Sequence, residues 1–277
     1  MKLRLTAGLI AVLASALPLP AATGVTSIQV SQNKVTAKIE LPGSLEADLE
    51  LTFEQALGLT ADSVGLTARV VDPTDLSLTS RFPSSVSVPA GFPVLIAIDP
   101  PSNGPLAFSG IASLDLHTHN LSYVTNSPLR LFTAEPGKKF QDITASTGLG
   151  SYRTGANKGG FSEFLILADV RPVDAVIADK LQRLQAKLDD NAGAIASSVR
   201  PTLQAALTAA RNAYLANDAV GAAEKTQQFA DLVKQNSGAA IPDVWRSARD
   251  VVNVAGELRS GASTLKFSLL FKASLGG

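Results

Sequence analysis

The residues best suited to chemistry are Asp115, His117 and His119, which include both histidines of the chain. On a β-strand their alternate spacing would put all three on one face, with Leu114 and Leu116 on the other. Two imidazoles and one carboxylate are a known donor set for zinc or iron. We therefore expect either a divalent metal site here or the ordinary polar outer face of a half-buried strand.

A second candidate is the glycine-rich stretch from Gly148 to Gly160. Its backbone amides could hold an anion beside Arg153 and Lys158. It departs from a phosphate-binding loop, because Gly159 follows the lysine where Ser or Thr is required. We expect a long hairpin loop whose rim, through Tyr152, Arg153 and Lys158, contacts a ligand.

Catalysis by carboxylates or by serine has little support in the sequence. Glycoside hydrolysis needs two facing carboxylates, and sequence alone cannot pair any of the candidate acids Asp99, Glu135, Asp142, Glu163 and Asp169. The chain also has no Gly-x-Ser-x-Gly motif. We expect a non-catalytic binding or structural protein. The alternatives are a metal-dependent enzyme using Asp115, His117 and His119, and a carbohydrate-binding module using Tyr123, Tyr152 or Trp245.

The N-terminus predicts export. Lys2 and Arg4 precede an apolar run from Leu5 to about Leu17, followed by small residues, which is the order of a secretory signal peptide. We expect residues 1–22 to be removed, which leaves a secreted or periplasmic protein of bacterial type without a transmembrane anchor. A retained membrane anchor is the alternative, although the run is shorter than the ~20 residues that a spanning helix needs.

Composition narrows the possible partners. The chain has 24 basic and 24 acidic residues, so loss of Lys2 and Arg4 leaves a net charge of 22 − 24 = −2. No basic stripe suggests nucleic acid. The absence of cysteine excludes disulfides, thiol catalysis and lipid attachment through cysteine. We expect no cofactor other than a possible divalent metal, and an unknown protein or glycan partner outside the cytoplasm.

Residues 23–170 are predicted to form a β-sandwich-like domain. Alternating runs at 25–30 and 35–41 flank a short turn, which predicts an antiparallel hairpin. Proline and glycine separate the later runs, and no helix-length segment intervenes except an ambiguous stretch at 54–57. Many short strands separated by proline and glycine favour a sandwich or barrel over a parallel sheet. The later runs lie at 49–53, 66–71, 94–98, 111–121, 129–132 and 161–168.

Near Arg171-Pro172 the apolar spacing changes to the threes and fours of helices. We expect a helical bundle over 171–260. Its helices begin near Pro172, Pro201, Asp218 and Pro242, and the last of them is expected to carry Trp245 and Leu258 on its buried side.

Within this bundle, Leu203, Ala206, Ala210, Phe229 and Val233 flank a turn at Asn217-Asp218, and Ser237-Gly238 ends the second helix. With these residues the segment from about 203 to 241 resembles the small helical module called FIMAH, which is appended to secreted bacterial enzymes and surface proteins. The resemblance implies an auxiliary, non-catalytic helical unit in an exported protein.

After Gly261 the pattern alternates again, with Leu265, Phe267 and Leu269 on one side and Lys266 and Ser268 on the other. We expect residues 261–277 to form a C-terminal strand that packs on the β domain, with a loose tail as the alternative. The predicted fold class is therefore α+β: an antiparallel β-sandwich-like domain, an α-helical hairpin bundle, and a last strand that returns to the sheet.

Overall fold

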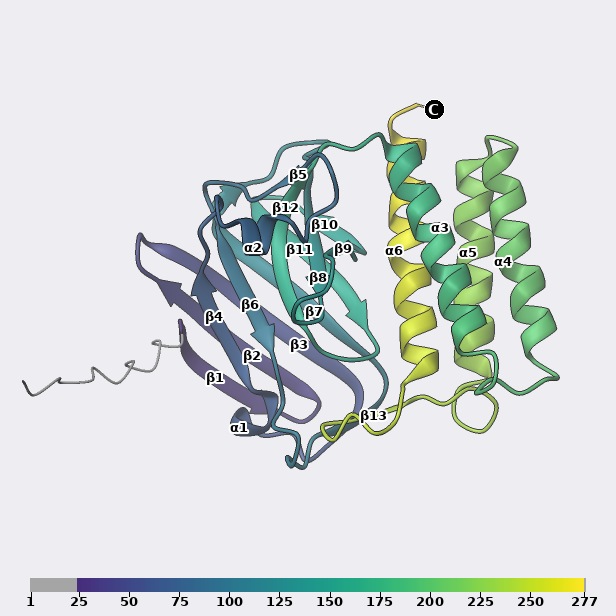
Figure 1. Ribbon diagram of the computed structural model, residues 1–277, viewed down its shortest axis with the longest axis horizontal. Helices are drawn as coiled ribbons and strands as arrows, with labels where there is room; N and C mark the ends of the chain where they lie inside the picture. The colour runs from purple at the N-terminus through teal and green to yellow at the C-terminus, as the bar shows by residue number, and fades with distance from the viewer. Residues whose placement is uncertain (1–23, 277) are drawn as a thin grey trace, which may run out of the picture.

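The computed structural model of this chain describes residues 24–276, so the predicted leader at 1–22 lies outside the described residues. Two antiparallel sheets lie face to face, and a group of long helices stands beside them (Figure 1). This arrangement confirms the α+β class predicted from the sequence.

The first sheet, sheet A, has the strand order β1-β2-β3-β7-β11-β10, and β13 pairs with part of β7. Every pairing in it is antiparallel. Its strands are β1 (Val25–Ser31), β2 (Lys34–Leu41), β3 (Leu45–Leu57), β7 (Ala107–Ser122), β10 (Ser146–Gly148), β11 (Ser151–Lys158) and β13 (Val244–Arg246). The predicted hairpin is β1–β2, and the ambiguous residues 54–57 continue β3 after a bulge between Phe53 and Gln55.

The second sheet, sheet B, has the order β4-β6-β12-β8-β9, and β5 pairs with β12. Its strands are β4 (Leu66–Val70), β5 (Val86–Ser87), β6 (Val94–Ile98), β8 (Leu129–Ala134), β9 (Gln141–Asp142) and β12 (Glu163–Asp169). Two single-turn helices lie in the connections, α1 (Ala61–Val64) and α2 (Leu76–Thr79). The strand predicted at 94–98 is β6, and its neighbours are β4 and β12, as expected for a central strand.

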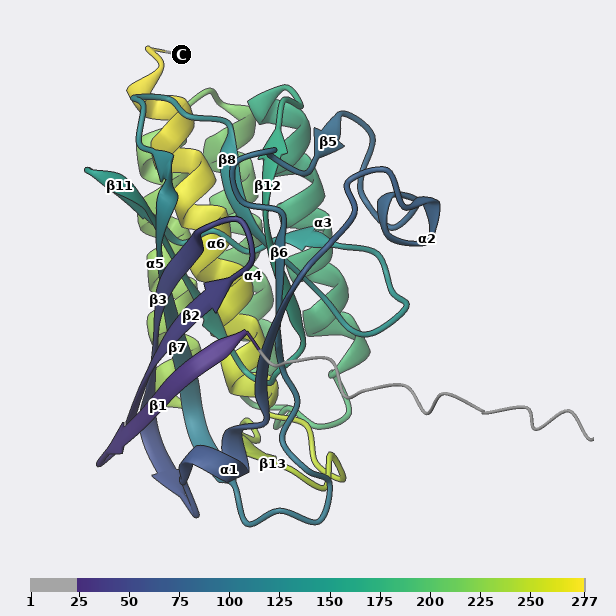
Figure 2. The same ribbon diagram turned by 90° about the vertical axis from the view of Figure 1, so that its left-hand side faces the viewer.

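The main core lies between the sheets. Sheet A contributes inward residues such as Leu49 and Leu114, and sheet B contributes Ile96 and Phe164. All four are at most 2% exposed, and their outward neighbours in sheet A are polar, which is the pattern of a sandwich layer. Figure 2, seen from the side of the sheets, shows the two layers in front of the helices.

Four long helices form the second core: α3 (Val173–Asp190), α4 (Arg200–Leu215), α5 (Ala219–Gln235) and α6 (Val254–Ser274). Helices α3, α4 and α5 lie where the apolar spacing predicts helices starting near Pro172, Pro201 and Asp218. The side chain of Asp218 caps α5 by accepting a hydrogen bond from the Gly221 backbone N–H at 2.7 Å. The antiparallel hairpin expected at 203–241 is α4–α5, while its resemblance to FIMAH stays a prediction. None of the described helices is long and apolar enough to cross a membrane.

The prediction of a strand at 261–277 is wrong, because residues 254–274 form helix α6. This helix lies between the sheets and the other helices, and it contacts α3 and α5 on one side and β7 and β11 on the other (Figure 1). A helix with one buried face repeats its apolar residues every 3.6 positions, but a helix buried on two sides has apolar residues on both, so this repeat is no longer visible in the sequence. The alternation that suggested a strand arises in this way.

The helix predicted to start at Pro242 is also wrong in position. Residues 244–246 form β13, which pairs with β7 through Trp245 opposite Phe108. Helix α6 starts only after Asn253, whose side-chain oxygen accepts a hydrogen bond from the Gly256 backbone N–H at 2.7 Å. A last strand therefore does return to the sheet, but it is β13, with α3, α4 and α5 inserted between it and β12.

Polar contacts join α6 to sheet A. Arg259 donates two hydrogen bonds of 2.7 Å to the carboxylate of Glu54 on β3. Asn253 donates to the backbone carbonyl of Gly110 on β7 at 2.6 Å. The strand β13, the helix α6 and these contacts tie the helical residues to the sandwich as one structural unit.

Candidate functional site

Strand β7 places Asp115, His117 and His119 on the outer face of sheet A, as the sequence predicts. Leu116 and Thr118 between them are at most 1% exposed and face the core. The imidazole of His117 keeps 21% of its surface exposed and that of His119 keeps 42%. The two rings lie beside each other, with their centroids 4.9 Å apart.

The carboxylate that approaches these rings is Asp48 on β3, directly opposite His117 in the ladder. One oxygen, Oδ2, lies 2.9 Å from His119 Nε2 and 3.7 Å from His117 Nδ1. Metal-ligating atoms of Asp48, His117 and His119 all lie within 4.8 Å of one another. On its other side, His119 Nδ1 lies 3.4 Å from Glu46 Oε2.

Asp115 does not belong to this group, which corrects the predicted donor set. Residues directly opposite each other on adjacent antiparallel strands have Cβ atoms ~5 Å apart, and the acid opposite His117 is Asp48. Asp48 therefore reaches the imidazoles more closely than Asp115, which lies opposite Glu50 and beside Gly155.

The surroundings favour a neutral His117. Burial lowers the pKa of His117, and the charge of Arg153 and the neighbouring imidazole of His119 lower it further, against the opposing effects of Asp48 and Asp115. Burial also raises the pKa of Asp115. A neutral imidazole is the form that binds metal. Asp48, Asp115, His117 and Arg153 are among the residues that line a depression of about 360 Å³ on the outer face.

The predicted ligand rim of Tyr152, Arg153 and Lys158 does not exist as one surface. The stretch is strand β11 and not a loop, so its side chains alternate between the two faces. Tyr152 is fully buried and donates a 2.6 Å hydrogen bond to the Leu129 backbone carbonyl. Arg153 points outward beside His117, while Lys158 faces the helices, where burial lowers its pKa.

The glycine that directly follows this strand, Gly159, serves close packing. A Cβ atom at Gly159 would lie 2.5 Å from the backbone nitrogen of Glu257, so only glycine lets the start of α6 approach the end of β11. Gly159, one of the glycines that suggested a long hairpin loop, is therefore required at the junction between strand and helix.

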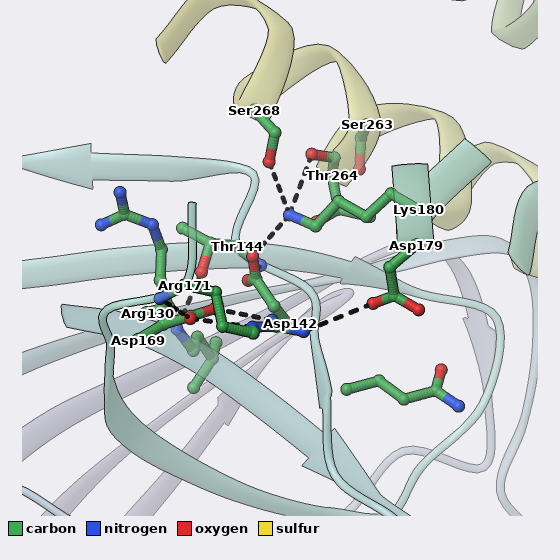
Figure 3. A network of polar contacts seen from close by, with 12 residues as sticks. Arg130, Asp142, Thr144, Asp169, Arg171, Asp179, Lys180, Ser263, Thr264 and Ser268 are labelled. Atoms are coloured by element: carbon green, nitrogen blue, oxygen red, sulfur yellow. Dashed lines mark hydrogen bonds and ion pairs between the residues drawn. The ribbon is translucent and has the colours of Figure 1, made fainter. Parts of the chain in front are cut away.

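Most of the candidate acids have basic partners. Lys180 on α3 lies 2.6 Å from Asp142 and also donates to Ser268 Oγ and to the Thr264 backbone carbonyl, as Figure 3 shows. Asp99 pairs with Arg249, Glu163 with Arg81 and Asp169 with Arg171. These ion pairs are structural contacts, and they give no support to a pair of catalytic carboxylates.

Two of the three aromatic side chains considered for sugar binding lie in the core. Trp245 stacks on Phe108 with ring centroids 5.4 Å apart and meets the Phe161 ring edge-on at 5.0 Å. Tyr152 is fully buried. Neither can offer an exposed face on which a sugar ring could stack.

Two residues of interest were missed by sequence reasoning. Asp48 is visible in the sequence only as one of the alternating acids Glu46, Asp48 and Glu50, and the register that sets it opposite His117 is not readable from one strand. Arg130 interrupts the apolar run 129–132, and a charge inside a buried strand is a signal that it needs a partner.

Comparison with protein-family models gives one match, a family of unknown function (DUF6689), over residues 5–273. Comparison with curated proteins gives no match.

Proposed function

This chain belongs to the DUF6689 family, and from its own chemistry we propose that it is a non-catalytic binding protein, active outside the cytoplasm, that takes up a divalent transition-metal ion. The observation that carries the proposal is the group of donor atoms from Asp48, His117 and His119 within 4.8 Å of one another. Export rests on the charged and then apolar order of residues 1–22.

The donor distances suit a tetrahedral ion. Zinc bonds of about 2.1 Å in tetrahedral geometry place neighbouring donor atoms about 3.4 Å apart. The distances from Asp48 Oδ2 to the two imidazoles, 2.9 and 3.7 Å, lie on either side of this value. Glu46 would accept a hydrogen bond from the second nitrogen of His119, which is the usual way a metal-ligating histidine is oriented.

Binding is favoured over catalysis by the position of the group. Catalytic metal ions work in concave sites that exclude water. Here Asp48 and His119 are about half exposed on an open sheet face, with side-chain exposures of 49% and 42%. The same exposure would let a partner molecule contact the bound ion directly.

The test uses tag-free protein stripped with EDTA, because a histidine tag would bind the same ions. Calorimetric titration with ZnCl₂ should give one ion per chain, and Co²⁺ should give the absorption of a tetrahedral complex. Asp48→Asn and His119→Ala should each weaken binding at least ~10-fold. Affinity should also fall below about pH 6, where protons compete for the imidazoles.

Asp115→Asn is the matched control, because it removes a carboxylate from the same face that the proposed donor set does not use. Its affinity for Zn²⁺ should equal that of the unmodified protein. The proposal fails if no stoichiometric ion binds, or if Asp115→Asn weakens binding as much as Asp48→Asn.

A further inference from the structure

Arg130 on β8 is a buried cation without a carboxylate partner. The residue is 9% exposed, and its Nη1 donates to the backbone carbonyls of Ser127 at 2.6 Å and Leu129 at 2.7 Å. None of the ion pairs within residues 24–276 includes it. Buried charges are normally paired, so this guanidinium is available to an anion from outside the chain.

Nearby acids are already engaged. Asp142 pairs with Lys180, and Asp169 pairs with Arg171, both at 2.6 Å. Figure 3 shows Arg130 beside this network, in which dashed lines mark the contacts of Lys180 and of Asp169 with Arg171. The remaining N–H groups of Arg130 have no acceptor among the described residues, and the residue lines a cavity.

That cavity has a volume of about 340 Å³ and lies between the β7–β8 connection and the C-terminal part of α6. Polar side chains of Tyr123, Asn126 and Thr147 line it together with Arg130, and the residues that line it include no acid. A volume of roughly 300 Å³ or more is typical of small-molecule sites. The cavity therefore has room for a ligand and a net charge of +1.

Two aromatic rings give the cavity an apolar wall. Phe267 and Phe271, one turn apart on α6, lie with their planes 9° apart and their centroids separated by 6.3 Å. The guanidinium carbon of Arg130 is 4.6 Å from the Phe271 centroid and 5.5 Å from that of Phe267. The rings hold the guanidinium in place and offer apolar surface to the body of a ligand.

We propose that this cavity is a second binding site, for a small aryl carboxylate. The carboxylate accepts hydrogen bonds from the guanidinium of Arg130, and the aryl ring packs against Phe271. One arginine matches one negative charge, and Tyr123 and Asn126 can bind polar substituents of the ring. The site shares no residue with the proposed metal site, so each can be tested alone.

The first test needs no variant. Benzoate and its neutral analogue benzamide are titrated into EDTA-treated, full-length mature protein, and binding is followed by calorimetry and by ligand-observed NMR. Benzoate should bind saturably with one molecule per chain, and benzamide at least ~10-fold more weakly, because it lacks the charge that Arg130 recognises. The proposal is overturned if benzoate does not bind to the folded protein, or if benzamide binds equally well.

Variants then locate the site. Arg130→Gln should weaken benzoate binding at least ~10-fold, and Phe271→Leu several-fold, whereas Arg69→Gln, an exposed arginine on β4, should leave affinity unchanged. Circular dichroism checks that each variant is folded. If Arg130→Gln does not fold, Phe271→Leu decides: unchanged benzoate affinity in that variant contradicts the proposed site.

Discussion

Replacing Lys180 by methionine should destabilise the whole protein, because it leaves a buried carboxylate without its cation. The Lys180 side chain has no exposed surface, and that of Asp142 has 1%. Removing one partner of a buried ion pair costs about 3–5 kcal/mol. Asp142 would keep its contacts with Thr144, including the 2.8 Å hydrogen bond from the backbone N–H, but it would lose the cation that lies against it. A domain is stable by about 5–15 kcal/mol in total, so the loss is a large fraction.

The assay is guanidinium chloride unfolding at pH 7, followed by far-UV circular dichroism, for Lys180→Met, Asp142→Asn and the double variant. The substituted amide in Asp142→Asn keeps an oxygen that can accept from the Thr144 backbone N–H, so this variant changes mainly the charge. Because the double variant carries neither charge, its loss should be smaller than the sum of the single losses by at least ~2 kcal/mol.

An exposed ion pair in sheet A is the control. Lys34 and Glu50 are as close, at 2.7 Å, but their side chains are 46% and 44% exposed. Lys34→Met should therefore cost less than ~1 kcal/mol. The reasoning is refuted if Lys180→Met costs no more than this control, or if the losses of the two single variants simply add.

The same lysine gives a prediction for alkaline pH. Burial lowers the pKa of Lys180 from 10.5 to about 8, against the opposing effect of Asp142. Between pH 8 and pH 10.5 this lysine is protonated to a greater extent in the unfolded chain than in the folded protein. The contribution of Lys180 to the free energy of unfolding therefore increases as the pH rises. Lys180→Met should lack this rise when unfolding is measured between about pH 8 and pH 10.5.

Three further outcomes are expected. Glu257→Gln should make the free energy of unfolding depend less on pH in acid. Burial alone would raise the pKa of Glu257, but Lys187 holds it at about 2. The ionised Glu257 side chain therefore stabilises the fold above pH 4.5, and this stabilisation is lost as the pH falls from 4.5 to about 2. A chain ending at residue 171 lacks β13 and α6, so thermal unfolding should be less cooperative and start at a lower temperature than in the full protein; an unchanged transition would show that the sandwich folds alone. Trp245→Ala removes a ring packed on two phenylalanines and should cost about 3–5 kcal/mol in denaturant unfolding, while Val252→Ala in the exposed loop before α6 should cost little.

Several elements were predictable because their signals are local. The β1–β2 hairpin follows from two alternating runs around a tight turn, and β6 agrees with its prediction at both ends. Helices α3, α4 and α5 each have one buried face, so their apolar spacing keeps the helical period, and the Asp218 cap marks where α5 begins. In each case the residues that decide the structure lie within a few positions of one another.

The same local logic failed where contacts with distant parts of the chain decide the structure. Helix α6 packs against β7 and β11 on one side and against α3 and α5 on the other. Its apolar residues therefore lie on both sides of the helix, and their spacing resembles the alternation of a strand. Strand β11 was predicted as part of a loop because glycines lie on both sides of it, and one of them, Gly159, is needed where α6 packs on the end of the strand. Trp245 has helical spacing to its neighbours, yet pairing with β7 holds it in a strand.

The candidate metal site divides in the same way. The sequence by itself determined that His117 and His119 share one face, because alternation along a strand is a property of the backbone. It could not supply Asp48, nor the cavity beside Arg130, because both depend on which segments become neighbours. Strand register and helix docking are set by packing between residues distant in the chain, and only the tertiary structure decides them.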